Sequence, residues 1–88
     1  MNESPAIGPV TSAPVGRLRW SCRRGMRELD VLLTRYLDRD FAAASRPERE
    51  AFVRLLGLQD PDLAAYLLAG APVIDPQFAP LVARIREP

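Results

Sequence analysis

Arginine is concentrated in one stretch of this sequence, where its side chains could bind anions. Five of the twelve basic residues fall within residues 17–27, and no carboxylate interrupts them. They are Arg17, Arg19, Arg23, Arg24 and Arg27. Guanidinium groups bind phosphates and carboxylates through paired hydrogen bonds, so the stretch could hold an acidic or phosphorylated group. On charge alone, the simpler interpretation is a solvated helix face whose last turn sets arginines against the negative end of the helix dipole.

The most specific local pattern is the run Arg-Gly-Met-Arg-Glu at residues 24–28. Gly25 is suited to end one helix, and Glu28 is suited to the first turn of the next. Helix capping does not explain Arg24 and Arg27, because a cation at a helix start is disfavoured by up to ~1 kcal/mol. A glycine bend also lets another backbone approach closely. We therefore predict a partner-docking point formed by Arg24, Gly25, Met26, Arg27 and Glu28.

The residue types argue against catalysis. The chain has no histidine and a single cysteine, Cys22, which removes imidazole acid/base chemistry, Cys/His pairs and the usual zinc sites. Glu28 and Asp30 are two residues apart on a predicted helix and point in different directions, so they do not form a carboxylate pair. We predict no enzyme activity, no metal site and, from the lone cysteine and the lack of a membrane span or export signal, a cytoplasmic protein.

Apolar residues recur at helical spacing after residue 16, which predicts a single all-α domain of five short helices over residues 17–88. The predicted helices are residues 17–23, the stretch from Met26 to about Asp40, residues 45–57, residues 60–70, and the stretch that begins at Asp75 and Pro76. Residues 1–16 hold three prolines and a single charge, and we predict a disordered tail there.

Several residues mark the expected helix ends. Ser45 and Glu48 form a capping box, in which the hydroxyl accepts from the Glu48 amide and the carboxylate reaches back to the Ser45 amide. Gly57 is expected to end that helix in the left-handed conformation. Asp60 is expected to cap the next helix. Pro80 lies too far into the last helix, which therefore has a loose first turn or starts later.

Other apolar and acidic side chains have simple structural explanations. Cys22 is expected to be a small buried group. Tyr36 and Tyr66 lie on apolar stripes and are expected in the core with their hydroxyls at its rim. Trp20 suits the core and an interface equally well. Asp62 is adequately explained as an anion in the first turn of a helix.

The run from Trp20 to Asp30 resembles the signature of the small FAD assembly factors of succinate dehydrogenase, a family defined by an Arg-Gly-x-x-Glu motif. The likeness continues, in the same order and at similar spacings, through residues 52–56, residues 60–63 and Gly70, so it covers essentially residues 17–86. Two features depart from the family: its members often carry Trp where this chain has Tyr66, and the proline-rich leader has no obvious counterpart.

The resemblance implies a five-helix domain that binds the flavoprotein subunit of succinate dehydrogenase, and in bacteria often that of fumarate reductase. Such a domain promotes covalent attachment of FAD to a histidine of the partner, which performs the chemistry itself. Arg24, Gly25 and Glu28 match the motif and are expected to be the core of the interaction, with Met26 and Arg27 beside them. Trp20 and Asp62 are further candidates for partner binding. The chain has no dinucleotide-binding fingerprint, so we predict no tight FAD binding by this protein alone.

Two alternatives come from other functional classes. A basic helical module could bind RNA or DNA through residues 17–27, although a net charge of +1 does not predict general adhesion to nucleic acid or membrane. Some members of the family have also been labelled antitoxins, but no residue here argues for that function. Nucleic-acid binding would weaken steeply with salt, whereas a protein interface would be specific for one partner.

Overall fold

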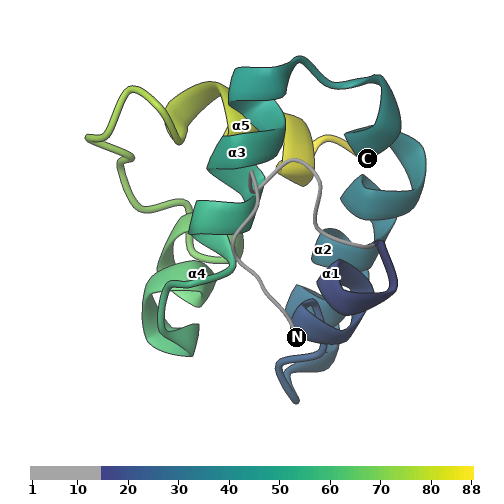
Figure 1. The fold of residues 1–88 in the computed structure, drawn as a ribbon. Coiled ribbons are helices and arrows are strands. Elements are labelled where there is room, and N and C mark those ends of the chain that lie inside the picture. The colour runs from purple at the N-terminus through teal and green to yellow at the C-terminus, as the bar shows by residue number, and fades with distance from the viewer. Residues whose placement is uncertain (1–14) are drawn as a thin grey trace.

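The computed structural model describes residues 15–88, and within that range it contains five α-helices, one short 3₁₀ helix and no strand (Figure 1). They are α1 (Val15–Ser21), α2 (Arg27–Arg39), η3 (Phe41–Ala43), α3 (Arg46–Leu55), α4 (Asp60–Leu67) and α5 (Ala79–Arg86). The all-α prediction is confirmed. Most of the predicted tail lies outside the described residues, but Val15 and Gly16 belong to α1, so the helical unit includes two residues assigned to the tail.

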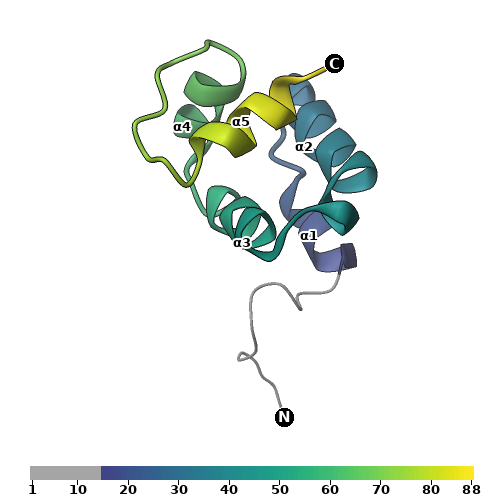
Figure 2. The ribbon, with the colours of Figure 1, turned by 90° about the horizontal axis from the view of Figure 1, so that it is seen from above.

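Helix α2 is the centre of the bundle and contacts α1, η3, α4 and α5. Helix α5 also packs against α3 and α4, and Figure 2 shows it lying between α2 and α4. The predicted apolar stripe of α2 faces inward, because its helical spacing places those side chains on one face. The fully buried side chains of the core include Leu29, Leu33, Tyr36, Phe52, Leu55, Leu63, Leu81 and Ile85. None of the described helices is long and apolar enough to cross a membrane.

The start of α3 confirms half of the predicted capping box. The Ser45 hydroxyl accepts a hydrogen bond from the Glu48 amide at 3.3 Å. The Glu48 carboxylate instead accepts from the Tyr36 hydroxyl at 2.6 Å. The left-handed end predicted at Gly57 is wrong: among residues 15–88 only Gly25 and Gly70 have positive φ. The amide of Gly57 bonds to the Arg54 carbonyl, so the chain leaves α3 through a right-handed turn that needs no special residue.

The starts of α4 and α5 also correct the prediction. Gln59 is the N-cap of α4, and Asp60 is its first helical residue, with a carboxylate that is used elsewhere. Pro80 left two alternatives, a loose first turn or a later start, and the structure shows the later start. Helix α5 begins at Ala79, so the proline lies in the first turn, where its missing amide costs little. Asp75 accepts from the Gln77 amide in the preceding turn and does not cap the helix. Tyr66 is only partly buried, at the edge of the core.

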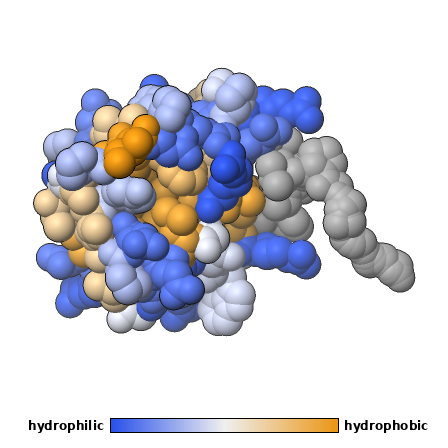
Figure 3. Space-filling model, turned by 90° about the vertical axis from the view of Figure 1, so that its left-hand side faces the viewer, coloured by the Kyte–Doolittle hydropathy of each residue, from blue (hydrophilic) through white to orange (hydrophobic). Residues whose placement is uncertain are grey.

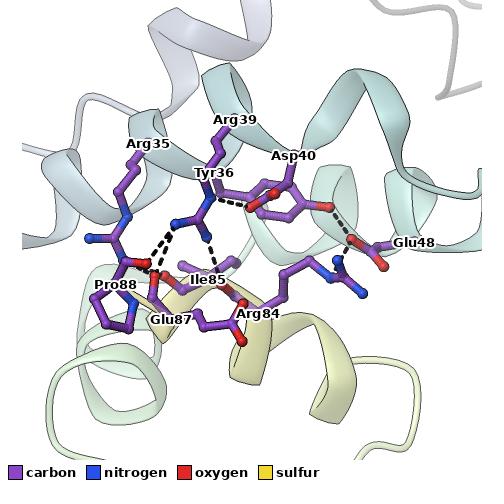
Figure 4. A network of polar contacts seen from close by, with 9 residues as sticks. All are labelled: Arg35, Tyr36, Arg39, Asp40, Glu48, Arg84, Ile85, Glu87 and Pro88. Carbon is purple, nitrogen blue, oxygen red and sulfur yellow. Dashed lines mark hydrogen bonds and ion pairs between the residues drawn. The ribbon is translucent and has the colours of Figure 1, made fainter.

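Two arginines of α2 fasten the end of α5, and we call them the C-terminal arginine pair (Figure 4). Arg35 donates to the carbonyls of Ile85 and Glu87 at 3.0 and 2.6 Å. Arg39 donates to the carbonyls of Arg84, Glu87 and Pro88. The last carbonyls of a helix have no partner within it, so these guanidiniums satisfy acceptors at the end of α5 and join it to α2.

Candidate functional site

The bend between α1 and α2 is exposed, and Gly25 shapes it. Gly25 has φ +83°, a conformation that other residues adopt only with strain. A side chain built on Gly25 would meet no atom within 4 Å at its first carbon, so the space beside the glycine is open. We call residues 24–28 the motif loop. Another polypeptide can therefore approach the backbone of this loop closely.

The Arg24 side chain turns away from that open space and into the molecule. Its exposed fraction is 16%. Its Nε donates to Asp60 Oδ1 at 2.8 Å, Nη1 donates to the carbonyls of Ser21 and Leu56 at 3.0 and 2.9 Å, and Nη2 donates to the carbonyl of Leu58 at 2.8 Å. The cation that seemed misplaced at the start of α2 is thus paired with a carboxylate of α4.

The remaining residues of the motif loop face outward. Met26 is 38% exposed, and Arg27 and Glu28 are exposed in the first turn of α2. Glu28 is placed where the helix dipole favours a carboxylate, as predicted. The loop therefore presents an apolar side chain, a cation and an anion next to the open glycine.

Trp20 lies at the surface, with 70% of its area exposed. The guanidinium of Arg23 lies 5.1 Å from the centre of its ring, within range of a cation–π interaction. Of the two positions that the sequence left open for Trp20, the structure shows the surface one. The expectation for Cys22 is confirmed, because its side chain is completely buried beneath this region.

The basic patch is less positive than the sequence suggested. Arg19 donates to the carboxylate of Asp38 on α2 at 2.5 Å. That hydrogen bond raises the pKa of Arg19 and lowers the pKa of Asp38. With Arg24 paired to Asp60 as well, two of the five arginines are engaged by acids of the same chain, which removes part of the basis for a nucleic-acid interface.

Two shallow hollows adjoin the motif loop. One, of about 410 Å³, is lined by Trp20, Arg23, Gly25 and Asp30. The other, of about 350 Å³, is lined by Arg27, Glu28, Val31, Leu32 and Leu68. The loop thus borders both an aromatic, charged hollow and a largely apolar one.

Sequence reasoning missed Val31 and Leu68, which are 54% and 37% exposed. Val31 carried a signal, because it lies off the apolar stripe that Leu29 and Leu33 define on α2. Leu68, just after α4, carried none. Asp62 is exposed in the first turn of α4, two residues beyond the Asp60 that binds Arg24, and lines neither hollow.

Comparisons with known proteins identify the family to which the chain belongs. A family model described as "Flavinator of succinate dehydrogenase" matches residues 16–88. This chain belongs to that family. A protein named FAD assembly factor SdhE from Methylococcus capsulatus is 51% identical over 71 residues, which cover 81% of this chain and 86% of that protein.

Two further relatives carry the same name. The protein from Shewanella oneidensis is 39% identical over 72 residues, 82% of this chain and 88% of its own length. One from Xylella fastidiosa is 45% identical over 74 residues, 84% of this chain and 76% of its own. The matched regions span most of the helical unit, so the family resemblance seen in the sequence is confirmed.

Among the described residues, no group of three or more cysteine, aspartate or glutamate side chains could hold a metal ion. The motif loop presents an open backbone at Gly25, the exposed side chains of Arg27 and Glu28, and the partly exposed Met26.

Proposed function

We propose that this protein binds the flavoprotein subunit of succinate dehydrogenase, and that of fumarate reductase where present, and promotes covalent attachment of FAD to it. The observation that carries the proposal is the exposed Gly25, with open space beside it and Met26, Arg27 and Glu28 directed outward. Family membership supplies the partner class, and the loop supplies a surface with the required shape and charge.

The contact surface in this proposal has a backbone part and a side-chain part. The Gly25 bend admits a segment of the flavoprotein close to the main chain, because no side chain blocks it. Glu28 can accept hydrogen bonds from partner amides, and Arg27 can pair with a partner carboxylate. Trp20 and Met26 supply apolar contact area, and Asp62 on α4 is an outlying contact. Exposed aromatic and methionine side chains are typical of interface centres.

The protein acts in this proposal by holding its partner, and has no catalytic group of its own. Binding stabilises the flavoprotein conformation in which its histidine lies against the FAD, and the flavoprotein forms the bond. The Arg24 guanidinium, which would suit a pyrophosphate, is already engaged by Asp60 and three carbonyls. We therefore assign FAD to the partner alone. The cytoplasmic location stays a prediction.

The test compares Gly25→Arg with Gly25→Asn. Both place a side chain at positive φ, which costs about 1–2 kcal/mol for most residues and less for Asn. Only Arg fills the open space. We expect Gly25→Arg to reduce covalent FAD on the co-produced flavoprotein sharply, while Gly25→Asn retains most of it.

Covalent FAD is measured as flavin fluorescence of the denatured flavoprotein, and folding of each variant by circular dichroism. Unchanged labelling with a folded Gly25→Arg protein would reject the proposed surface. Loss of helical signal in that variant alone would show that Gly25 serves the fold rather than the partner.

A further inference from the structure

Two carboxylates that lie outside the Arg-Gly-x-x-Glu motif, those of Asp30 and Asp60, accept hydrogen bonds from Arg24. We infer that Arg24, Asp60 and Asp30 are positioning residues, which together hold the loop in the shape that the flavoprotein recognises, and that Arg24 does not itself contact the partner. We call these three residues the loop clamp. The inference rests on the proposed function and assigns roles within the same surface.

The loop clamp holds Arg24 from both sides. Its backbone amide donates to Asp30 Oδ1 of α2 at 2.7 Å. Its guanidinium reaches across to Asp60 of α4 and to the carbonyls of Leu56 and Leu58 in the connection before α4. With both ends of Arg24 held, the chain must enter α2 within two residues, and Gly25 makes that turn at φ +83°.

The Arg24 guanidinium has too few free donor groups to bind a partner carboxylate as well. A guanidinium has five N–H groups. Four hydrogen bonds are already made: one from Nε, two from Nη1 and one from Nη2. A partner carboxylate could bind Arg24 in the usual two-pronged way only after acceptors of the same chain were displaced. Arg27, three residues later, is exposed and needs no such displacement.

The acceptors explain why an arginine is needed. Ser21 is the last residue of α1, and Leu56 and Leu58 follow the end of α3, where carbonyls lack partners within the helix. One planar group satisfies carbonyls from both places and a carboxylate of α4. Lysine has a single nitrogen and cannot reproduce this geometry. Fixing the loop before binding removes an ordering cost from the association, and preorganised surfaces bind more tightly for that reason.

The test is a double-mutant cycle with Arg24→Lys, Asp60→Asn and the combined variant. Binding to the purified flavoprotein subunit is measured by titration calorimetry at a temperature where circular dichroism shows every variant folded. We expect each single variant to bind about fivefold or more weakly, and the combined variant to bind no more weakly than the worse single one, because residues of one network are not additive.

Two further measurements exclude a general loss of structure. The amide signal of Gly25 in ¹H–¹⁵N spectra should shift in both single variants, since each releases the loop. Asp38→Asn is the matched control: it removes the carboxylate from another Arg–Asp pair, one that joins α1 and α2 at the surface. It should leave both the affinity and the Gly25 signal unchanged. If Asp60→Asn fails to fold, Asp30→Ala releases the loop from its other side and should weaken binding in the same way.

The outcomes separate this inference from the proposed function. If Arg24 contacts the flavoprotein directly, Asp60→Asn frees its guanidinium, so affinity is kept or improved and the two substitutions add; that result overturns the loop clamp. Normal affinity in all clamp variants also overturns it, while the proposed function survives if Gly25→Arg still abolishes binding. If Gly25→Arg binds normally as well, the proposed function itself fails.

Discussion

Two regions of this molecule use arginine in the same way and differ in what surrounds it. At the motif loop, Arg24 donates to carbonyls at the ends of α1 and α3. At the opposite end of α2, Arg35 and Arg39 donate to carbonyls at the end of α5 (Figure 4). In both places a guanidinium supplies donors to carbonyls that a helix end leaves unpaired.

The surroundings separate the two regions. Around the C-terminal arginine pair the polar groups face one another: Arg39 also pairs with Asp40 at 2.9 Å, and Glu48 accepts from the Tyr36 hydroxyl and lies 3.4 Å from Arg84. Beside Arg24, by contrast, lies an exposed glycine with open space next to it. Hollows do not distinguish the regions, because they also border Glu48 and Arg35. An arginine that donates to helix-end carbonyls therefore stabilises the fold in both regions and does not by itself mark a binding surface. The motif loop differs in the open space beside Gly25 and in the exposed Arg27 and Glu28, which the proposed function uses as a binding surface.

The largest difference in stability and binding should appear when one arginine of each region is replaced in turn. Arg24→Ala leaves Asp60 without its cation and should lower the free energy of unfolding by about 2–3 kcal/mol and weaken flavoprotein binding. Arg39→Ala removes a more exposed side chain and should cost about 1 kcal/mol, with normal covalent FAD on the flavoprotein. Urea unfolding and flavin fluorescence measure the two quantities. Equal loss of labelling in both variants would contradict the distinction.

The sequence was sufficient where local rules decide the structure. The stripe on α2 follows from helical spacing and the Ser45 cap from its own hydroxyl, and Pro80 limited α5 to a loose first turn or a late start. Each depends on residues within a turn or two. The surface position of the Gly25 bend follows similarly, because a glycine between two amphipathic helices seldom has a reason to be buried.

The contacts that long side chains make with residues distant in the sequence could not be predicted in this way. Arg24 and Asp60 are 36 residues apart. Asp60 had an adequate local explanation as a helix cap, whereas Arg24 was unexplained at the start of a helix and was assigned to a partner. Their pairing depends on how α4 packs beside the motif loop. Trp20 suited two environments equally, and only the packing of α1 against α2 placed it outside. Long-range packing therefore determines which residues of the motif remain available to a partner.

A second comparison tests the apolar hollow beside the loop. Val31→Asp places a charge in the hollow lined by Arg27, Glu28 and Leu68, at an exposed helix position where the fold tolerates it. If the flavoprotein covers this hollow, the buried charge should weaken binding about tenfold.

Ile74→Asp is the matched control for Val31→Asp. Ile74 is 92% exposed, in the segment between α4 and α5, and belongs to neither hollow. That segment lies on the side seen in Figure 3, where apolar surface is interspersed with hydrophilic residues. The variant should bind normally by titration calorimetry. Equal weakening by both substitutions would show that apolar surface in general, and not this hollow, governs association.

A smaller effect on stability is expected from Tyr36, in the core beside the C-terminal arginine pair. Tyr36 is completely buried, and its hydroxyl donates to Glu48. Burial and the neighbouring carboxylate raise the pKa of Tyr36 far above its usual range. Tyr36→Phe removes one hydrogen bond to a charged group and should lower the free energy of unfolding by about 1.5 kcal/mol in urea. Covalent FAD on the flavoprotein should not change; a loss of labelling at normal stability would make the second region part of the binding surface.

The smallest effect concerns the buried thiol of Cys22, which lies beneath the motif loop. Burial raises the pKa of its thiol to about 11, with nearby Arg19 and Arg24 opposing the rise and Asp30 and Asp38 adding to it. The folded state therefore favours the neutral thiol. This contribution to stability is complete below the pKa of the thiol in the unfolded chain, which is about 8.5, and it is lost as pH rises toward 11.

The Cys22 effect can be separated from that of Tyr36, which acts in the same direction at higher pH, by working in the Tyr36→Phe background. Between pH 8 and about pH 9.3, the free energy of unfolding should fall by about 1 kcal/mol more in the protein with Cys22 than in the Cys22→Ala variant. Urea unfolding at each pH measures the difference. Parallel pH profiles would mean that the thiol ionises as easily in the folded protein as in the unfolded chain, and that the packing beneath the motif loop admits water.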